Sequence, residues 1–259
     1  AWQRDTEHVE KSFVFAGMPA RNGVTAALLV QLGGTGVTDV LSGADNFLQA
    51  FAPQANPEQL IDKLGQRYEV TSTNIKKWTV GGPIQAALDA LQAVLKRRPI
   101  EPDQVKQMIV RLGPVMGSVV NNREMPDICV QHMLAVMLID KTASFTAAHD
   151  KARMQDPAVL RQRAKIQLIL DPEIEHNAEE QREAIVEVTL IDGAQLREHV
   201  TAVRGTAANP MTRDEVVAKC RDLITPVLGA AKTANLISRM LNLETVKNVA
   251  DLRLLLQRA

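Results

Sequence analysis

The sequence predicts an α + α/β protein in which two helical regions flank a central region that mixes helices and strands. Helical periodicity dominates up to about residue 65 and again after about residue 205. Between them lie β-branched runs and a strong hairpin signal. A chain that leaves a helical layer and returns to it suggests an inserted or appended central domain. We therefore expect residues 1–65 in a helical domain, 66–205 as an α/β domain, and 206–259 as helices returning to the first domain.

Helices are indicated by apolar residues at i, i+3 and i+4 spacing and by capping residues at their starts. The clearest apolar stripe comprises Ile84, Ala87, Leu88, Leu91, Val94 and Leu95. Thr212 and Glu215 have the spacing of a capping box, and Asp127 is expected to cap a strongly apolar helix. The expected helices cover residues 24–32 (buried), 45–52, 57–64, 83–97, 128–140, 157–163, 213–224, 230–241 and 245–258.

Strands are expected where β-branched or alternating apolar residues lie between turn signals. Asp192 and Gly193 form the strongest hairpin signal in the chain, which predicts that residues 184–191 pair with 196–203. The expected strands cover residues 67–73, 105–112, 165–170, 184–191 and 196–203.

Composition excludes several classes of partner. The 259 residues include 30 basic and 30 acidic side chains, so the formal net charge is +0, whereas nucleic acids and acidic membranes need a basic surface. Aromatic residues make up only 3%, too few for base-stacking platforms. No apolar run is expected to approach the roughly 20 residues of a membrane span, and the polar start is not a signal peptide. These features favour a cytoplasmic protein that binds neither nucleic acid nor membrane.

Cys129 and Cys220 lie far apart in the sequence and are expected to be free thiols in a reducing cytoplasm rather than a disulfide. The chain starts without methionine in an irregular polar segment. We expect that it begins inside a longer protein, with a processed N-terminus as the alternative.

The common catalytic and metal-binding motifs are missing. The sequence contains no HExxH, CxxC or GxSxG, and the glycines of residues 33–36 lack the GK[ST] ending of a phosphate loop. We therefore expect no metal site and no cofactor. His132 lies in an otherwise apolar run, where it is either a core or interface residue or a site residue. His149 and His176 are interpreted as surface residues, and His8 and His199 are assigned no role.

Basic residues beside turns are the best candidates for a binding site, because loops on a rigid scaffold concentrate binding residues. Residues 71–87 supply two adjacent lysines, then glycines and a proline that favours the first helical position. A helix N-terminus near a lysine suits an anion, although an ordinary joint with solvated lysines is the alternative. Basic groups converging from separate loops would bind a di- or tricarboxylate, with scattered surface charge as the alternative. These basic residues are Lys11, Arg21, Lys76, Lys77, Arg123 and Arg204.

An ordered set of stretches resembles the MmgE/PrpD family, which includes 2-methylcitrate dehydratase, cis-aconitate decarboxylase and iminodisuccinate epimerase. The stretches are PARNGVTAALL (19–29), NIKKW (74–78), NNREMP (121–126), AVMLID (135–140) and RGTAANPMTRDEV (204–216). The resemblance implies an all-helical domain, incomplete here and formed from both ends of the chain, with an inserted α+β lid. It also implies a homodimer, and a site between helical domain and lid that handles small polycarboxylates without a cofactor.

The resemblance also implies roles for particular residues. Lys11, Arg21 and a lid lysine, Lys76 rather than Lys77, would bind carboxylates and stabilise an enolate-like transition state. The family's acid–base histidines and aspartate lie upstream of the ARNG stretch, so the catalytic residues are expected before residue 1 and this chain alone is expected to be inactive. The implied activity is that of a hydro-lyase, with an epimerase, an isomerase, a decarboxylase or a non-catalytic oligomerisation fragment as alternatives.

Overall fold

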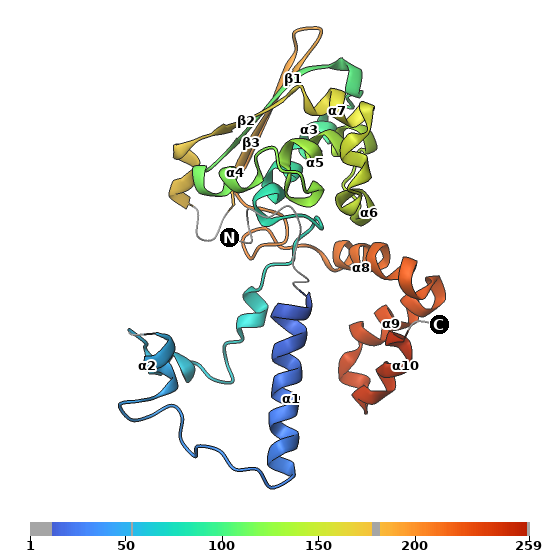
Figure 1. Ribbon diagram of the computed structural model, residues 1–259. Helices are drawn as coiled ribbons and strands as arrows, with labels where there is room; N and C mark the ends of the chain where they lie inside the picture. Colours follow the sequence, from blue (N-terminus) through green and yellow to red (C-terminus); the bar gives the residue numbers. More distant parts are fainter. Residues whose placement is uncertain (1–11, 53, 178–181, 258–259) are drawn as a thin grey trace. The chain divides into compact units, whose positions relative to one another are not determined.

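A computed structural model describes residues 12–52, 54–177 and 182–257, with the side chains of residues 12 and 175–177 left out (Figure 1). The chain divides after Ser72 into two compact units.

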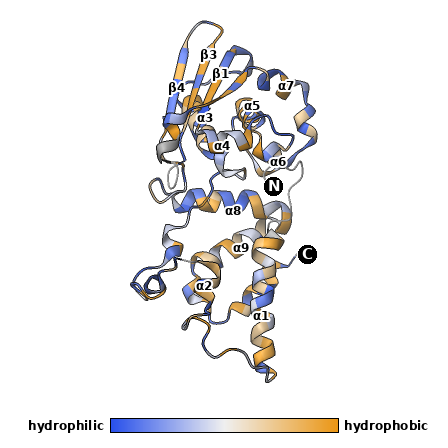
Figure 2. Ribbon diagram, turned by 60° about the vertical axis from the view of Figure 1, so that its left-hand side comes forward, coloured by the Kyte–Doolittle hydropathy of each residue, from blue (hydrophilic) through white to orange (hydrophobic). Residues whose placement is uncertain are grey.

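The first unit is helical, and none of its described residues is buried. A π-helical turn, Ser12–Gly17, leads into α1 (Met18–Gln31), which is followed by the short α2 (Phe47–Phe51). The predicted helix at 24–32 is therefore present, but its predicted burial is wrong: Leu29 is 57% exposed. Apolar bands remain on the surface of α1 and α2 (Figure 2), since nothing described within this unit covers them.

The stretch Phe13–Gln31 is long and apolar enough to cross a membrane, judged by length and composition alone. The expectation that no apolar run approaches this length is therefore wrong for this stretch. The stretch lies near the N-terminus and includes the charged Arg21, and length and composition alone do not identify a membrane span.

The predicted strand at 67–73 is also wrong, because Glu69–Ser72 forms a 3-10 helix. The amide of Thr71 donates to the carbonyl of Tyr68 over 3.0 Å. β-branched residues favour strands only where a neighbouring strand takes up their backbone hydrogen bonds. No described strand pairs with this segment, so local hydrogen bonds replace the ladder.

The second unit contains a four-stranded mixed sheet with the order β2-β1-β3-β4. Its strands are β1 (Val105–Leu112), β2 (Ile166–Leu170), β3 (Ala184–Leu190) and β4 (Gln195–Val200). β1 and β2 are parallel, whereas β1–β3 and β3–β4 are antiparallel. The predicted hairpin is confirmed, with Gly193 at φ 86° in its turn, although β4 ends at Val200 rather than at 203.

Helices cover the sheet and complete the core of the second unit (Figure 1). α3 (Gln85–Arg97) follows a 3-10 turn, Gly82–Ile84, and packs on β3 and β4. Its predicted apolar stripe is confirmed, since Leu88 and Leu91 are fully buried. α5 (Val130–Asp140) is buried along most of its length, and its N-cap is Cys129 rather than the predicted Asp127. The remaining helices of this layer are α4 (Pro114–Val120), α6 (Phe145–His149) and α7 (Pro157–Arg163).

The last α-helices of the described residues are α8 (Arg213–Leu228), α9 (Ala230–Leu241) and α10 (Arg253–Leu256). The predicted capping box is confirmed, because Thr212 and Glu215 exchange both hydrogen bonds at the start of α8. α8 continues through Pro226 to Leu228, beyond the predicted end at 224. The predicted helix at 245–258 is instead two 3-10 turns and the short α10.

The predicted α+β character is thus confirmed, with a small mixed sheet and many helices. The lid role, the helical domain built from both ends and the division at 65 and 205 stay predictions. The other 3-10 helices of the described residues are Pro57–Leu60, Pro102–Gln104, Pro126–Ile128, Ala152–Gln155, Pro172–Asn177, Leu243–Thr245 and Val249–Leu252.

Candidate functional site

Two loops far apart in the sequence lie side by side in the second unit. We call residues 74–82 the lysine loop and residues 201–209 the arginine loop. The amide of Ile75 donates to the carbonyl of Gly205 over 2.8 Å. Gly205 has φ +98°, and a Cβ there would lie 1.8 Å from the carbonyl oxygen of Ile75. Only glycine allows this approach, since both the backbone angle and the missing space exclude a side chain.

The side chain of Gln85, in the first turn of α3, holds the lysine loop. Its Nε2 donates to the carbonyls of Trp78 (2.7 Å) and Val80 (3.2 Å), and its Oε1 accepts from the Trp78 amide (3.1 Å). Gln85 is only 2% exposed. Because these are buried backbone groups that need partners, one glutamine fixes the conformation of the loop that follows the lysines.

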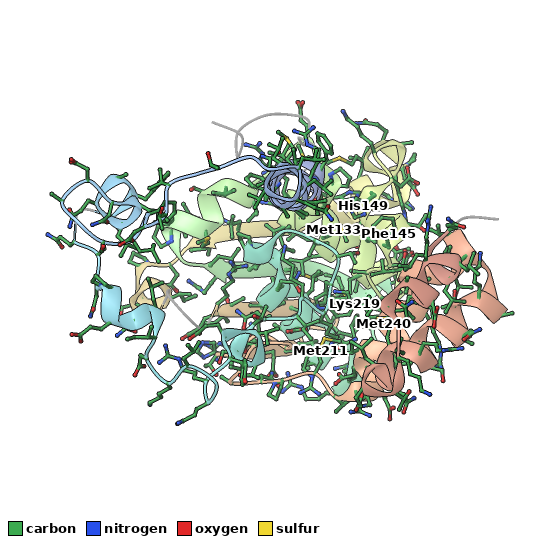
Figure 3. All side chains as sticks on the ribbon, turned by 90° about the horizontal axis from the view of Figure 1, so that it is seen from below. Met133, Phe145, His149, Met211, Lys219 and Met240 are labelled. Atoms are coloured by element: carbon green, nitrogen blue, oxygen red, sulfur yellow. The ribbon has the colours of Figure 1, made fainter. Side chains whose placement is uncertain are left out.

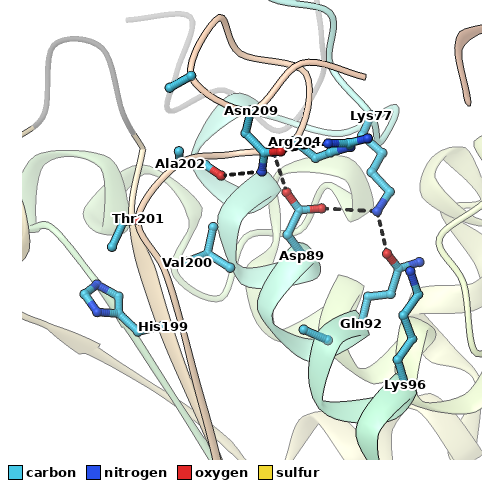
Figure 4. Close-up of a pocket in the computed structure, with 12 residues that line it drawn as sticks. Lys77, Asp89, Gln92, Lys96, His199, Val200, Thr201, Ala202, Arg204 and Asn209 are labelled. Carbon is cyan, nitrogen blue, oxygen red and sulfur yellow. Dashed lines mark hydrogen bonds and ion pairs between the residues drawn. The ribbon is translucent and has the colours of Figure 1, made fainter. Parts of the chain in front are cut away.

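Asp89, one helical turn further along α3, joins the two loops (Figure 4). Its carboxylate accepts from the Trp78 indole Nε1 over 2.9 Å and from the Arg204 backbone amide over 2.8 Å. Lys77 Nζ lies 3.5 Å from the same carboxylate and 4.5 Å from the centre of the Trp78 ring. Asp89 therefore binds one residue of the arginine loop and two of the lysine loop.

Arg204 is held by polar side chains on its other side. Its Nη1 donates to Asn209 Oδ1 over 2.8 Å, and its Nε and Nη2 form a two-point ion pair with Glu215, at 3.2 and 2.5 Å. The hydrogen bond from Arg204, with help from the Thr212 amide, lowers the pKa of Glu215 to about 2. The arginine loop is thereby tied to the start of α8.

Two cavities lie against these loops. The smaller, of about 190 Å³, is lined by Asn74, Ile75, Lys76, Gln85, Arg182, Val203, Arg204, Gly205 and Thr206. The larger, of about 480 Å³, is lined by Lys77, Asp89, Gln92, Ala93, Lys96, His199, Val200, Thr201, Ala202, Arg204, Ala208 and Asn209 (Figure 4). The neighbouring lysines thus line different cavities, and Arg204 lines both.

The smaller cavity is cationic. Lys76, Arg182 and Arg204 line it, whereas the described lining residues include no carboxylate and no histidine. Lys76 Nζ donates a hydrogen bond of 3.4 Å to the carbonyl of Val80. Ammonium and guanidinium groups at a small cavity favour a carboxylate or phosphate ligand.

The predicted basic site residues fall into four groups. Arg123 lies between α4 and α5 and lines neither cavity. Lys76, Lys77 and Arg204 are brought together in the second unit. Arg21 lies in α1 of the first unit, exposed and with Nη2 3.3 Å from Asn22 Oδ1, and its convergence with the lysines stays a prediction. Lys11 lies outside the described residues, and its role stays a prediction as well.

None of the histidines whose side chains the structure describes lines the smaller cavity. His132 is fully buried in α5, and neither ring nitrogen has a hydrogen-bond partner among the described residues. Burial above all, then the charges of Arg163 and Arg153, lower the pKa of His132 to about 4, while Asp150 opposes this. The structure thus favours the core alternative for His132, and its role in binding stays a prediction.

His149 is exposed, and its ring stacks on the ring of Phe145, with 4.3 Å between the ring centres (Figure 3). His199 lies 3.0 Å from Glu183 and lines the larger cavity. His8 lies outside the described residues, and the side chain of His176 is not described.

Burial of neutral His132 predicts a pH-dependent loss of stability. Its pKa is about 4 in the folded chain and about 6.5 in an unfolded one. The contribution of neutral His132 to the free energy of unfolding is therefore fully present above pH 6.5. It is lost as the pH drops towards 4, which lowers the free energy of unfolding by about 3 kcal/mol. Urea unfolding between pH 7 and 4 should show a smaller decline for His132→Leu than for the wild type. Equal declines would show that His132 does not titrate in this way.

Sequence reasoning missed Gln85, Asp89 and Arg182. Gln85 and Asp89 stand four residues apart on α3, which places both on one face beside the apolar stripe, so their spacing could have identified a polar face. Arg182 has no local signal. Its guanidinium lies where a side chain on Gly82 would be, with Nη1 1.5 Å from the position of such a Cβ, and only the fold reveals this contact.

Cys129 and Cys220 are free cysteines. Among the described residues, no group of three or more His, Cys, Asp and Glu side chains is placed to hold a metal ion.

The second unit is thus an α+β domain in which two joined loops present basic side chains to a small cavity. A comparison with protein families matches residues 78–244 to the MmgE/PrpD C-terminal domain. The match covers more than half of the chain, and the chain belongs to the MmgE/PrpD family. This confirms the resemblance and its assignment to the C-terminal portion. A search among curated proteins gave no match.

Proposed function

We propose that this chain is the C-terminal part of a cofactor-independent hydro-lyase that acts on a small di- or tricarboxylate. The observation that supports it is the smaller cavity with Lys76, Arg182 and Arg204, formed in a domain of a family that includes hydro-lyases. Substrates with two or three carboxylates match such a lining in charge.

Lys76 and Arg182 would bind the substrate, while Arg204 has a structural part. The guanidinium of Arg204 is already paired with Glu215 and Asn209, so it holds the arginine loop that forms part of the cavity wall. In a dehydration, a base removes the proton next to a carboxylate, and the C–H electron pair forms the double bond as hydroxide leaves. Negative charge grows on that carboxylate in the transition state, where a nearby ammonium or guanidinium stabilises it.

Replacing Lys76 with alanine should weaken binding of 2-methylcitrate and cis-aconitate to this chain roughly ten- to a hundredfold, as expected for a charge-assisted hydrogen bond. Isothermal titration calorimetry at fixed ionic strength measures the effect. Lys106→Ala is the matched control, because Lys106 is an exposed lysine on β1 that lines neither cavity. Equal affinities for Lys76→Ala and Lys106→Ala would refute the proposed site.

The chain should bind these acids without converting them. The described residues that line the smaller cavity offer no aspartate, glutamate or histidine, and removal of a proton next to a carboxylate needs a positioned base. Incubation with 2-methylcitrate or cis-aconitate, followed by chromatography, should show no product. Turnover would contradict this expectation, and its product would then identify the reaction. From 2-methylcitrate, loss of water to give an unsaturated acid would indicate a hydro-lyase. Loss of CO₂ would indicate a decarboxylase, and an inverted centre an epimerase.

A further inference from the structure

The larger cavity is a separate feature of the second unit with its own lining. One face of α3 contributes Asp89, Gln92, Ala93 and Lys96, which follow i, i+3, i+4 and i+7 spacing. The end of β4, the arginine loop and Lys77 of the lysine loop form the rest of the wall (Figure 4). Its volume of about 480 Å³ lies within the range of cavities that hold small ligands.

Positive charge exceeds negative charge on this lining. Lys77, Lys96 and Arg204 line the cavity, and Asp89 is the one carboxylate among the described lining residues. Asp89 is already occupied by the Trp78 indole, the Arg204 amide and Lys77. Glu215, which neutralises Arg204, does not line the cavity, so Lys96 adds a positive charge that no described lining carboxylate offsets.

Lys77 is held in place before any ligand arrives. Its ammonium donates to Gln92 Oε1, lies against Asp89 and sits over the Trp78 ring. Burial above all lowers the pKa of Lys77, and the nearby charge of Lys96 lowers it further, while Asp89 opposes both. A bound anion would reduce the repulsion between the two lysines, and a preorganised ammonium loses little entropy on binding.

We propose that the larger cavity is a second anion site, in which Lys77 and Lys96 hold a small dianion bearing carboxylate or phosphate oxygens. Thr201 and Asn209 line the same cavity. The Thr201 hydroxyl could donate to a ligand oxygen, as could the Asn209 amide N–H that does not donate to the Ala202 carbonyl. Ala93, Val200 and Ala202 form an apolar wall that suits a short carbon skeleton. This site is distinct from the Lys76 cavity and does not depend on the proposed lyase activity.

Trp78 gives a direct probe of this cavity, because Lys77 lies over its ring. The chain has two tryptophans, Trp2 and Trp78, so Trp2→Phe leaves Trp78 as the single indole. We would titrate this variant with inorganic phosphate and, separately, with malate, at fixed ionic strength, and follow fluorescence and calorimetric heat. A saturable signal with either anion is the expected result. Phosphate alone would indicate a phosphorylated ligand, and malate alone a carboxylic acid.

Lys96→Ala in the same background should weaken binding of the effective anion at least tenfold. Lys96 is exposed at the end of α3, so its replacement should not affect folding. Lys96→Arg should retain most of the affinity, and both Lys106→Ala and Lys76→Ala should leave the Trp78 signal unchanged. The proposal is overturned if neither anion gives a saturable signal by either method, or if Lys96→Ala binds as tightly as its parent. Loss of the signal in Lys76→Ala would equally overturn it, since the anion would then occupy the smaller cavity.

Discussion

Replacing Gly205 with alanine is expected to separate the two loops and to destabilise the second unit by about 3 kcal/mol. The new Cβ would lie 1.8 Å from the carbonyl oxygen of Ile75 and 2.9 Å from its carbon. Backbone atoms cannot rotate away as a flexible side chain can, so the loops must move apart and lose the Ile75–Gly205 hydrogen bond. Because both loops line the smaller cavity, binding of 2-methylcitrate should fall with stability.

Gly193→Ala is the matched control for this prediction. Gly193 also has positive φ, +86°, but a Cβ there meets nothing within 4 Å. It should therefore show only the strain of the left-handed backbone, roughly 1–2 kcal/mol, and leave ligand affinity unchanged. Urea unfolding and calorimetry on both variants separate strain from steric overlap. If the two variants lost the same stability and kept the same affinity, the close approach at Gly205 would have no functional importance.

Replacing Asp89 with alanine is expected to lower the free energy of unfolding by about 3 kcal/mol and to loosen both loops together. The change leaves the Trp78 indole and the Arg204 amide without their acceptor, and it leaves the Lys77 ammonium with Gln92 but without its carboxylate partner. A buried donor without a partner costs on the order of 1–3 kcal/mol, and water can reach the ammonium more easily than the other two. Urea unfolding measures the loss, and Trp78 fluorescence in the Trp2→Phe background reports the local change.

Asp103→Ala is the control for Asp89→Ala, since Asp103 is exposed in the 3-10 turn before β1. Asp89→Asn should give an intermediate loss, because the amide keeps one acceptor oxygen but not the charge that faces Lys77. Stability of Asp89→Ala equal to that of Asp103→Ala would show that the two loops are held without Asp89.

Elements with local signals could be predicted from the sequence. The stripe of α3 follows helical spacing, the β3–β4 turn needs only Asp192 and Gly193, and the start of α8 needs only its capping box. Each of these signals lies within a few residues and keeps its meaning in any fold. The predicted cap of α5 was wrong although Asp127 has a capping side chain, because a 3-10 turn precedes the helix and makes Cys129 the N-cap.

Features that depend on tertiary contacts could not be predicted. Residues 67–73 have strand-forming side chains but no described strand beside them. Lys76 and Lys77 were candidates for one site, yet they line different cavities because Gln85 and Asp89 fix the turn around Trp78. Arg182 lies just before β3, and only the fold brings its guanidinium next to Gly82. Lys76, Lys77 and Arg204 were thus predictable as basic site residues, whereas Arg182 and the division of the lysines between two cavities were not.

A crystal structure of the chain with bound 2-methylcitrate tests the central claim most directly. We predict a carboxylate of the acid at hydrogen-bonding distance, about 2.7–2.9 Å, from Lys76 Nζ, with a second carboxylate facing the Arg182 guanidinium. An acid bound at Lys77 and Lys96 alone, with the Lys76 cavity empty, would contradict the proposed substrate site.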